Sequence, residues 1–289
     1  MKRLNFFFSI VFSIVVFSGC SSAPKKATEI FTDRNTAIKQ LDLANYTANR
    51  GQYESALVVL EGARNLALST DDPPLRLRTS ISRGNFLFAL SRNTEAFAEW
   101  ESAAVEGDAS GEPILAALAR IYSIRAKIVL LETETGTANV QELKEQLNRE
   151  MTAVKSDDSA TAVGNIALGF AEKQMGHWAD AESAVKKALS YHEGSLFLED
   201  AAYDWFLIAS IRSMAGNYSA SLEALETAIS FDRRAENGFG LASSWQAKGD
   251  VLKKAGRDGE AQTAWNRAAD IYRAIGLNNL AEKVEGKYK

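Results

Sequence analysis

The sequence predicts an all-α solenoid built from about six helical hairpins. The first observation behind this prediction is a repeat, because glycine turns begin at Gly176, Gly216 and Gly256 with a constant spacing of 40 residues. A small residue follows each glycine by five positions, and the same pattern begins at Gly51 and, with serine in place of glycine, at Ser91. Self-similarity at a fixed period of this size is typical of stacked repeats that share a continuous core.

The second observation is a composition that favours long helices. Hydrophobic residues make up 46% of the 289 residues, and no proline follows Pro113. A proline inside a helix costs about 3 kcal/mol, so a long stretch without proline favours uninterrupted helices. A repeat array has no single globular core, and the length of the chain therefore says little about the number of domains.

The chain begins with the features of a bacterial lipoprotein. Lys2 and Arg3 precede an apolar run over residues 6–17 that is short for a membrane span. The Ser18-Gly19-Cys20 segment that follows resembles the lipobox, in which cleavage precedes the cysteine and its sulfur takes a diacylglycerol. This resemblance implies a signal peptide over 1–19, lipidation of Cys20, and a flexible spacer to residue 27. A secreted protein or an uncleaved anchor helix is the alternative.

The cysteine content and the net charge argue against a catalytic thiol and against nucleic acid as a partner. Cys20 is the only cysteine, so no intramolecular disulfide can form, and His177 and His192 lie too far along the chain to support a catalytic thiol. Loss of residues 1–19 removes Lys2 and Arg3 and leaves 31 basic residues against 37 acidic ones, a net charge of −6. This balance favours neither nucleic acid nor an anionic lipid surface as a partner.

One hairpin shows how each repeat is expected to form. An apolar stretch over 205–215 keeps helical spacing until Gly216, because glycine accepts the left-handed conformation that closes a helix. A second helix over about 218–231 then packs back on the first. The small residues Ala209 and Ser221 are expected where the two helices approach most closely.

These units resemble the tetratricopeptide repeat, whose 34-residue consensus places tryptophan, leucine-glycine, tyrosine, alanine and phenylalanine at fixed spacing. The matching positions are Ala44, Ala56 and Leu60; Gly84, Ala96 and Trp100; Leu168, Gly169, Ala181 and Val185; Trp205, Ile208, Ala209, Ser221 and Leu225; and Trp245, Lys248, Gly249, Ala261 and Trp265. The chain differs in its 40-residue period and in lacking the closing proline, which fits longer helices or longer loops. The resemblance implies five such repeats in a right-handed solenoid that binds other proteins.

The repeats fall into two blocks joined by a segment that lacks their signature. The N-terminal block is expected over 28–108, and the C-terminal block over 159–289, ending in a capping helix from residue 277. Between them, residues 109–158 predict a degenerate hairpin, with a turn near residues 135–137. This hairpin is either a bent spacer that changes the path of the superhelix or a binding site of its own.

In this repeat family the first helices of successive hairpins line a concave groove, which implies a set of contact residues. They are Asn45, Asn49, Arg78, Asn85, Phe88, Phe170, Lys173, Gln174, Tyr203, Phe206, Met214, Gln246, Asp250, Lys253 and Lys254. Asn45 and Asn85 lie 40 residues apart, and an asparagine amide can both donate to and accept from the backbone of an extended peptide. Simple solvation of these side chains is the alternative interpretation.

Two comparisons with the family limit what the groove can bind. The chaperone-adaptor version grips a terminal carboxylate with a lysine, and Leu41 and Ile81 stand where that lysine belongs, so no carboxylate clamp is expected. The aromatic residues Phe170, Tyr203 and Phe206 fit apolar side chains of a partner, or else form part of the core.

The sequence contains no motif for catalysis, metal or a cofactor. The two histidines lack metal-ligand spacing, and the glycines lie in helix turns and not in a phosphate-binding loop. We therefore expect a non-enzymatic scaffold that binds an envelope or periplasmic protein, with no nucleic acid as partner. The lipid anchor places it on the periplasmic face of a membrane, and Ser21 after the cysteine resembles lipoproteins sent to the outer membrane. The alternative is a carrier of an apolar small molecule, and a homo-oligomer is left open.

Overall fold

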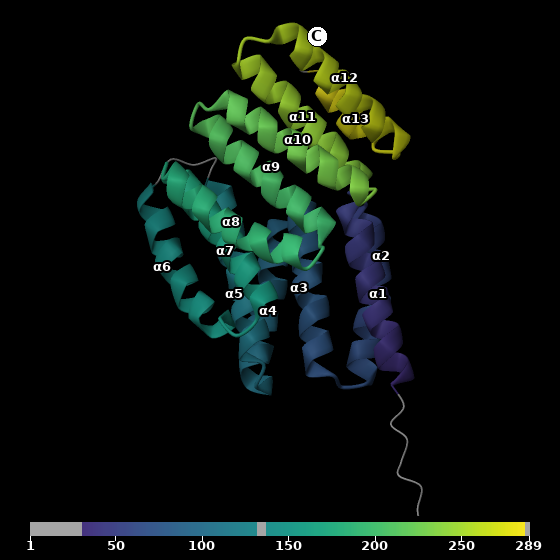
Figure 1. Ribbon diagram of the computed structural model, residues 1–289. Helices are drawn as coiled ribbons and strands as arrows, with labels where there is room; N and C mark the ends of the chain where they lie inside the picture. Colours follow the sequence, from purple (N-terminus) through teal and green to yellow (C-terminus); the bar gives the residue numbers. More distant parts are fainter. Residues whose placement is uncertain (1–30, 132–136, 287–289) are drawn as a thin grey trace, which may run out of the picture. The chain divides into compact units, whose positions relative to one another are not determined.

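The computed structural model describes residues 31–131 and 137–286, which form thirteen α-helices and no β-strand (Figure 1). The all-α class and the solenoid of hairpins are confirmed. The helices are α1 (Thr32–Asn49), α2 (Tyr53–Ser69), α3 (Pro73–Ala89), α4 (Asn93–Ser110), α5 (Pro113–Leu131), α6 (Thr137–Val154), α7 (Asp158–Gln174), α8 (Trp178–Gly194), α9 (Leu198–Met214), α10 (Tyr218–Arg234), α11 (Gly238–Lys254), α12 (Asp258–Ala274) and α13 (Asn278–Glu285). Within the described part, no helix has the length and apolar character needed to cross a membrane. The signal peptide, Cys20 and the spacer lie outside the described residues.

A regular step of 20 residues runs through the second half of the array. From α7 to α12 every helix has 17 residues and every connection has three. A hairpin with its two connections therefore fills 40 residues. The difference from the 34-residue family consensus comes from longer helices, each extended by nearly one turn, and not from long loops.

The turns that join the two helices of a hairpin share one backbone feature. Gly51, Gly176, Gly216 and Gly256 have φ between +74° and +80°, the left-handed region predicted for them. Ser91, which takes the glycine position in the second repeat, also has a positive φ of 61°. A residue with a Cβ loses about 1–2 kcal/mol in this region, which explains why glycine recurs at the position.

Small residues in one helix of a hairpin leave room for large ones in the other. A Cβ added at Gly84 would lie 2.7 Å from Cδ1 of Trp100, and one added at Gly249 would overlap the indole of Trp265. In the hairpin of α9 and α10, the buried hydroxyl of Ser221 donates a hydrogen bond of 2.7 Å to a backbone carbonyl of α9. The small residues at the positions that resemble the repeat consensus therefore allow the two helices of a hairpin to pack closely.

The first helices of the hairpins lie on the inner side of the array. Successive first helices contact one another, α1 with α3, α3 with α5, α5 with α7 and α9 with α11. Successive second helices make no comparable contacts in the part of the chain that the structure describes. The degenerate hairpin consists of α5 and α6, and α7 packs against both. At the other end, α13 packs on α12 and buries Ala281 and Val284.

Candidate functional site

The predicted groove residues all lie on first helices, namely α1, α3, α7, α9 and α11. Their exposure differs widely along this inner face. Exposed residues are Asn49, Arg78, Tyr203, Met214, Lys253 and Lys254; half-buried residues are Asn45, Asn85, Phe88, Phe170, Gln174, Phe206, Gln246 and Asp250; and Lys173 is buried. The predicted residues of the inner face therefore include exposed side chains that a partner could contact and others that are partly or fully buried in the core.

Two pairs of predicted residues lie together on this face. The rings of Tyr203 and Phe206 on α9 stack with centroids 6.4 Å apart and planes 15° from parallel. On α7, the ammonium of Lys173 lies 5.0 Å from the ring centre of Phe170, a cation–π contact. Phe170 and Phe206 both pack on the same core cluster. Because much of both rings is used there, the structure does not favour an apolar ligand enclosed between them.

Two amides on the inner face keep an unused hydrogen-bond acceptor. Asn85 Oδ1 and Gln174 Oε1 are buried and have no hydrogen-bond partner. The Asn85 side chain also hydrogen-bonds to Tyr122 of α5, whose pKa is raised by burial. A buried acceptor without a donor costs about 1–3 kcal/mol, so a donor brought by a partner would stabilise a complex at either position.

Other predicted groove residues are turned toward their own hairpin. The Phe88 ring lies 5.9 Å from that of Trp100, and the carboxylate of Asp250 accepts a 2.9 Å hydrogen bond from Nε1 of Trp265. Gln246 accepts a weak hydrogen bond of 3.4 Å from the Tyr272 hydroxyl. Lys253 pairs with Asp258 at 3.1 Å across the next turn. Leu41 and Ile81 are buried in the core. The predicted residues that remain exposed are therefore on α1, α3, α9 and α11, and those on α7 are half-buried or buried.

Sequence reasoning missed a contact between the first hairpin and the last ones. Asn49 Nδ2 donates a 2.6 Å hydrogen bond to Glu199 Oε2 of α9, although 150 residues separate them. The Tyr53 ring meets the Phe239 ring of α11 edge-on, with centroids 6.4 Å apart and planes at 89°.

Gly51, between these two residues, packs against Phe239 and Leu277. We call this set the closing contact: Asn49, Gly51 and Tyr53 on one side, and Glu199, Phe239 and Leu277 on the other. Figure 1 shows the ends of α1 and α2 next to α9 and α11. The sequence contained one indication of this contact. Phe239 lies one period after the charged Glu199, so the repeat pattern does not explain an aromatic residue at this position.

Buried carboxylates occupy equivalent joints between neighbouring hairpins. Asp204 lies 2.6 Å from Nδ1 of His192, and burial raises the pKa of Asp204 to about 6. One period later, Asp232 accepts hydrogen bonds from Asn237 at 3.0 Å and Ser244 at 3.1 Å. Burial raises the pKa of Asp232 to about 7. The joint therefore keeps its polar pair while the carboxylate moves from one helix to the other.

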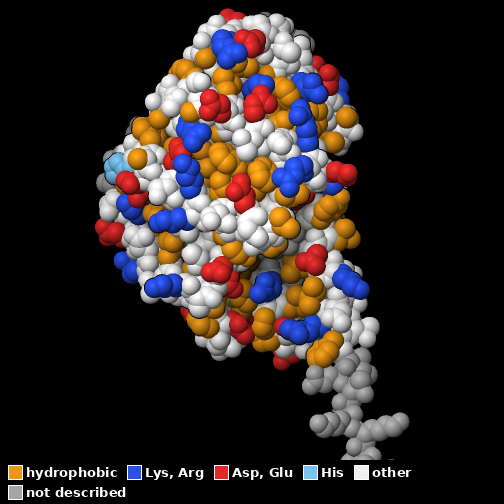
Figure 2. Space-filling view, viewed as in Figure 1, with side chains coloured by type: hydrophobic (Ala, Val, Ile, Leu, Met, Phe, Trp, Pro, Cys, Tyr) orange, Lys and Arg blue, Asp and Glu red, His pale blue; other side chains and the backbone are white. Residues whose placement is uncertain are grey.

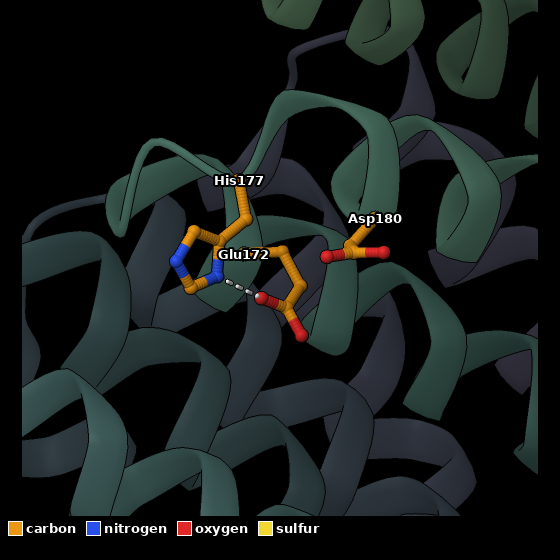
Figure 3. Close-up of side chains that lie close together, drawn as sticks. All are labelled: Glu172, His177 and Asp180. Carbon is orange, nitrogen blue, oxygen red and sulfur yellow. Dashed lines mark hydrogen bonds and ion pairs between the residues drawn. The ribbon is translucent and has the colours of Figure 1, made fainter.

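Among the described residues, three side chains of types that can bind a metal ion lie close together. The ligand atoms of Glu172, His177 and Asp180 lie within 4.8 Å of one another (Figure 3). However, the carboxylate of Glu172 is bound by Nδ1 of His177 at 2.9 Å and by Nζ of Lys144 at 2.6 Å. An ammonium ion bound to this carboxylate opposes a second cation. We assign to the group a structural role at the turn between α7 and α8.

An open cleft of about 430 Å³ lies between α8, α9 and α10, away from the predicted aromatic residues. Arg212 spans it with two hydrogen bonds to Glu182, of 2.7 and 3.1 Å, and one to the Ala220 carbonyl. The hydrogen bond from Arg212 holds the pKa of Glu182 at about 2. The cleft is lined by Trp178, Ala179, Glu182, Ile211, Arg212, Ala215, Asn217, Ala220 and Glu223. Because Arg212 and Glu182 already pair with each other, we assign this cleft to the packing of neighbouring hairpins and not to a ligand.

Charges of both signs are mixed on the surface. Figure 2 shows basic and acidic side chains interspersed over the face that is in view, with neither sign gathered into one large area. A protein that binds nucleic acid commonly presents a basic patch or stripe. The face shown in Figure 2 has no such feature.

Comparisons with known proteins place the chain by its fold. No family model matches the chain, and no curated protein matches its sequence. BtubC (BKLC) from P. vanneervenii is similar in structure, with a TM-score of 0.52 and 15% identity over 83% of this chain and 92% of that chain.

Two further solved structures resemble the chain less well. PilW, a type IV pilus biogenesis factor, has a TM-score of 0.49 and 14% identity over 85% of this chain and 97% of its own. The STAND protein PH0952 from Pyrococcus horikoshii, which has a tetratricopeptide repeat sensor, has a TM-score of 0.46 and 13% identity over 88% of this chain and 41% of its own. At these identities the likeness concerns the fold alone.

Proposed function

We propose that the chain is a membrane-anchored, non-catalytic scaffold that binds another cell-envelope protein through the inner face of its hairpins. The observation that carries this proposal is the pair of unpaired amide oxygens of Asn85 and Gln174, on α3 and α7. An extended peptide offers a backbone N–H at every residue except proline. Rotation of either amide toward the groove would let its oxygen accept a hydrogen bond from such a donor.

Aromatic side chains on α9 add to the proposed surface. Tyr203 is 44% exposed although its ring stacks on Phe206, so part of its side chain lies at the surface, where a partner could contact it. Aromatic residues dominate the energetics of many protein interfaces because they bury a large area in a fixed position. An inner face that offers amides and an aromatic pair fits a protein partner better than a uniformly charged one.

The proposed anchor is the lipid on Cys20. Ten residues lie between Cys20 and Phe31, the first described residue, and an extended chain over these eleven Cα–Cα steps spans at most about 40 Å. The array would then lie close to a periplasmic membrane face, and Ser21 favours the outer membrane. Assembly of an envelope complex and service as a transporter accessory both fit such a scaffold. Replacement of Cys20 by serine is expected to release the protein from the membrane fraction, and a variant that stays in that fraction would refute the anchor.

The binding surface is tested by crosslinking the tagged protein in its native cells and identifying captured proteins by mass spectrometry. The test variant carries Asn45→Asp and Asn85→Asp. A matched control carries Asn65→Asp and Asn148→Asp, which make the same change of charge on the exposed sides of second helices. A protein captured by the control and lost from the test variant supports the inner face as the binding surface.

Two other outcomes contradict the proposal. A protein captured equally by both variants would place the binding surface elsewhere on the array. If no protein is captured and purified samples carry a lipid or other apolar molecule, the carrier function replaces the scaffold.

A further inference from the structure

We propose that the closing contact is a latch, and that a partner reaches the inner face after this latch opens. The partner in this inference rests on the proposed function, whereas the latch itself is a property of the chain alone. The contact joins the turn between α1 and α2 to the starts of α9 and α11 and to the connection between α12 and α13. It therefore links the first hairpin to the fifth and sixth without help from those between.

The closing contact is small compared with the interfaces that hold the hairpins together. It consists of one hydrogen bond, one edge-on aromatic pair, and the packing of Gly51 on Phe239 and Leu277. Along their described lengths, α1 and α2 pack on each other and on α3, and not lengthwise on any helix from α9 to α13. The first hairpin also has its own core cluster. Opening the latch would separate few contacts and leave every hydrophobic cluster intact, which is the property of a low-stability, local opening.

The closing contact also adjoins the proposed binding surface. Glu199, which accepts the hydrogen bond from Asn49, lies four residues before Tyr203 on α9, so the two side chains are one helical turn apart on the same face. Asn49 is itself a predicted groove residue, and its amide is occupied by Glu199. A peptide that runs along the inner face from Tyr203 toward α1 would meet the closing contact. Closed and open states therefore differ in how much of the inner face a partner can use.

The repeat supplies a matched control for this contact. Gly51, Gly216 and Gly256 hold equivalent turn positions with φ of +76°, +80° and +74°. A Cβ at Gly51 would lie 2.7 Å from Cδ2 of Phe239 and 3.1 Å from Cδ1 of Leu277. A Cβ at Gly216 or Gly256 would meet nothing within 4 Å. Alanine thus brings the same backbone strain to all three turns but presses on a distant hairpin only at Gly51.

The experiment measures the distance across the closing contact. Spin labels are placed on cysteines introduced at the exposed positions Val58 of α2 and Gln262 of α12, in the full chain with Cys20→Ser, and read by double electron–electron resonance. We expect Gly51→Ala to add a population at longer distance, and Gly256→Ala to keep the distance distribution of the parent. Identical distributions for the two alanine variants would overturn the latch.

A second variant opens the latch without straining the backbone. Phe239→Ala removes the ring that both Tyr53 and Gly51 contact, so it should lengthen the label distance as Gly51→Ala does. Circular dichroism confirms that each variant keeps its helices. If Gly51→Ala does not fold, the distance measured for Phe239→Ala decides, and an unchanged distance there refutes the latch.

Affinity for the purified partner then tests the coupling. The apparent Kd equals the intrinsic Kd divided by the fraction of molecules in the binding-competent state. If about one molecule in ten is open, a fully open variant binds about tenfold more tightly. An unchanged Kd in a variant whose label distance has lengthened would overturn the coupling between the latch and binding, whereas the inner face as the binding surface is decided separately by the crosslinking of the Asn45→Asp, Asn85→Asp variant.

Discussion

Replacement of Asp232 by asparagine is expected to stabilise the protein at neutral and alkaline pH. The Asp232 side chain is 2% exposed, and both of its described hydrogen-bond donors, Asn237 and Ser244, are neutral. Burial therefore raises its pKa from 3.8 to about 7, and the charge of Glu199 adds to this effect. Asparagine has nearly the same shape but never carries the charge.

The magnitude follows from the linkage between protonation and folding. A pKa raised from 3.8 to about 7 corresponds to about 4 kcal/mol, at 1.36 kcal/mol for each pH unit. The folded state binds the proton more tightly than the unfolded state, so this contribution to stability is fully present below pH 3.8. It is lost as the pH rises toward 7. The stability advantage of Asp232→Asn should grow from near zero at pH 4 to as much as about 4 kcal/mol at pH 8.

Urea unfolding followed by circular dichroism, at half-unit steps from pH 4.5 to 8, measures this difference. Asp204 also has a raised pKa, of about 6, but it is present in both proteins and cancels when they are compared. Asp42→Asn, on the exposed side of α1, controls for the change in net charge. A difference between Asp232→Asn and its parent that stays constant across this pH range would refute the reasoning.

Three further predictions concern packing and one ion pair. Gly249→Ala should lower the free energy of unfolding by about 1–3 kcal/mol, because the added Cβ overlaps the Trp265 indole. Gly259→Ala, whose Cβ would have nothing within 4 Å, should raise it by about 0.5–1 kcal/mol. Equal effects of the two variants in urea unfolding would contradict this reasoning. Ser221→Ala should cost about 1 kcal/mol in the same assay, since it removes one buried hydrogen bond without leaving a cavity. Glu182→Gln should flatten the fall of Tm between pH 4.5 and 2, because a carboxyl with a pKa of about 2 stabilises the fold above pH 4.5 and loses this effect as the pH falls; an unchanged profile would refute the role of Arg212.

The fold was predictable because its determinants lie within one 40-residue unit. The spacing of Gly216 and Gly256 indicated the turns, and the positive φ of Ser91 shows that the pattern identified a turn even without glycine. Ser221 and the small residues opposite it indicated where two helices meet, which the hydrogen bond between α10 and α9 confirms. Turn conformation and hairpin packing are local, so a single sequence is enough to read them.

The fate of individual groove side chains could not be read in the same way. Lys173 occupies a groove position of the family pattern, yet it is only 6% exposed because α7 packs on both α5 and α6. Asp250 sits on the same stripe, and its carboxylate accepts from Trp265 across the hairpin. Periodicity gives the direction of a side chain to within a broad arc, whereas the neighbouring helix decides which part of that arc is open.

The closing contact lay furthest from the reach of sequence patterns. Asn49 and Glu199 meet only because the rotations of four successive hairpins add up to bring them together. The distance between these two residues therefore cannot be predicted from the sequence of any single repeat. Each joint up to α9, including the one where Asp204 of α9 pairs with His192 of α8, contributes to this sum.

The regular step and the closing contact place opposite demands on the length of the array. Deletion of residues 158–197 would remove one whole hairpin with its connections, and each remaining helix would keep its local sequence and turns. Gly51 and Phe239 would both survive, but they would face each other one rotation short of contact. Repeat arrays generally gain and lose units with little penalty because each unit touches only its neighbours. Here the gain or loss of one hairpin would remove the contacts of Asn49 and Gly51 with the later helices, although every remaining hairpin would keep its own packing.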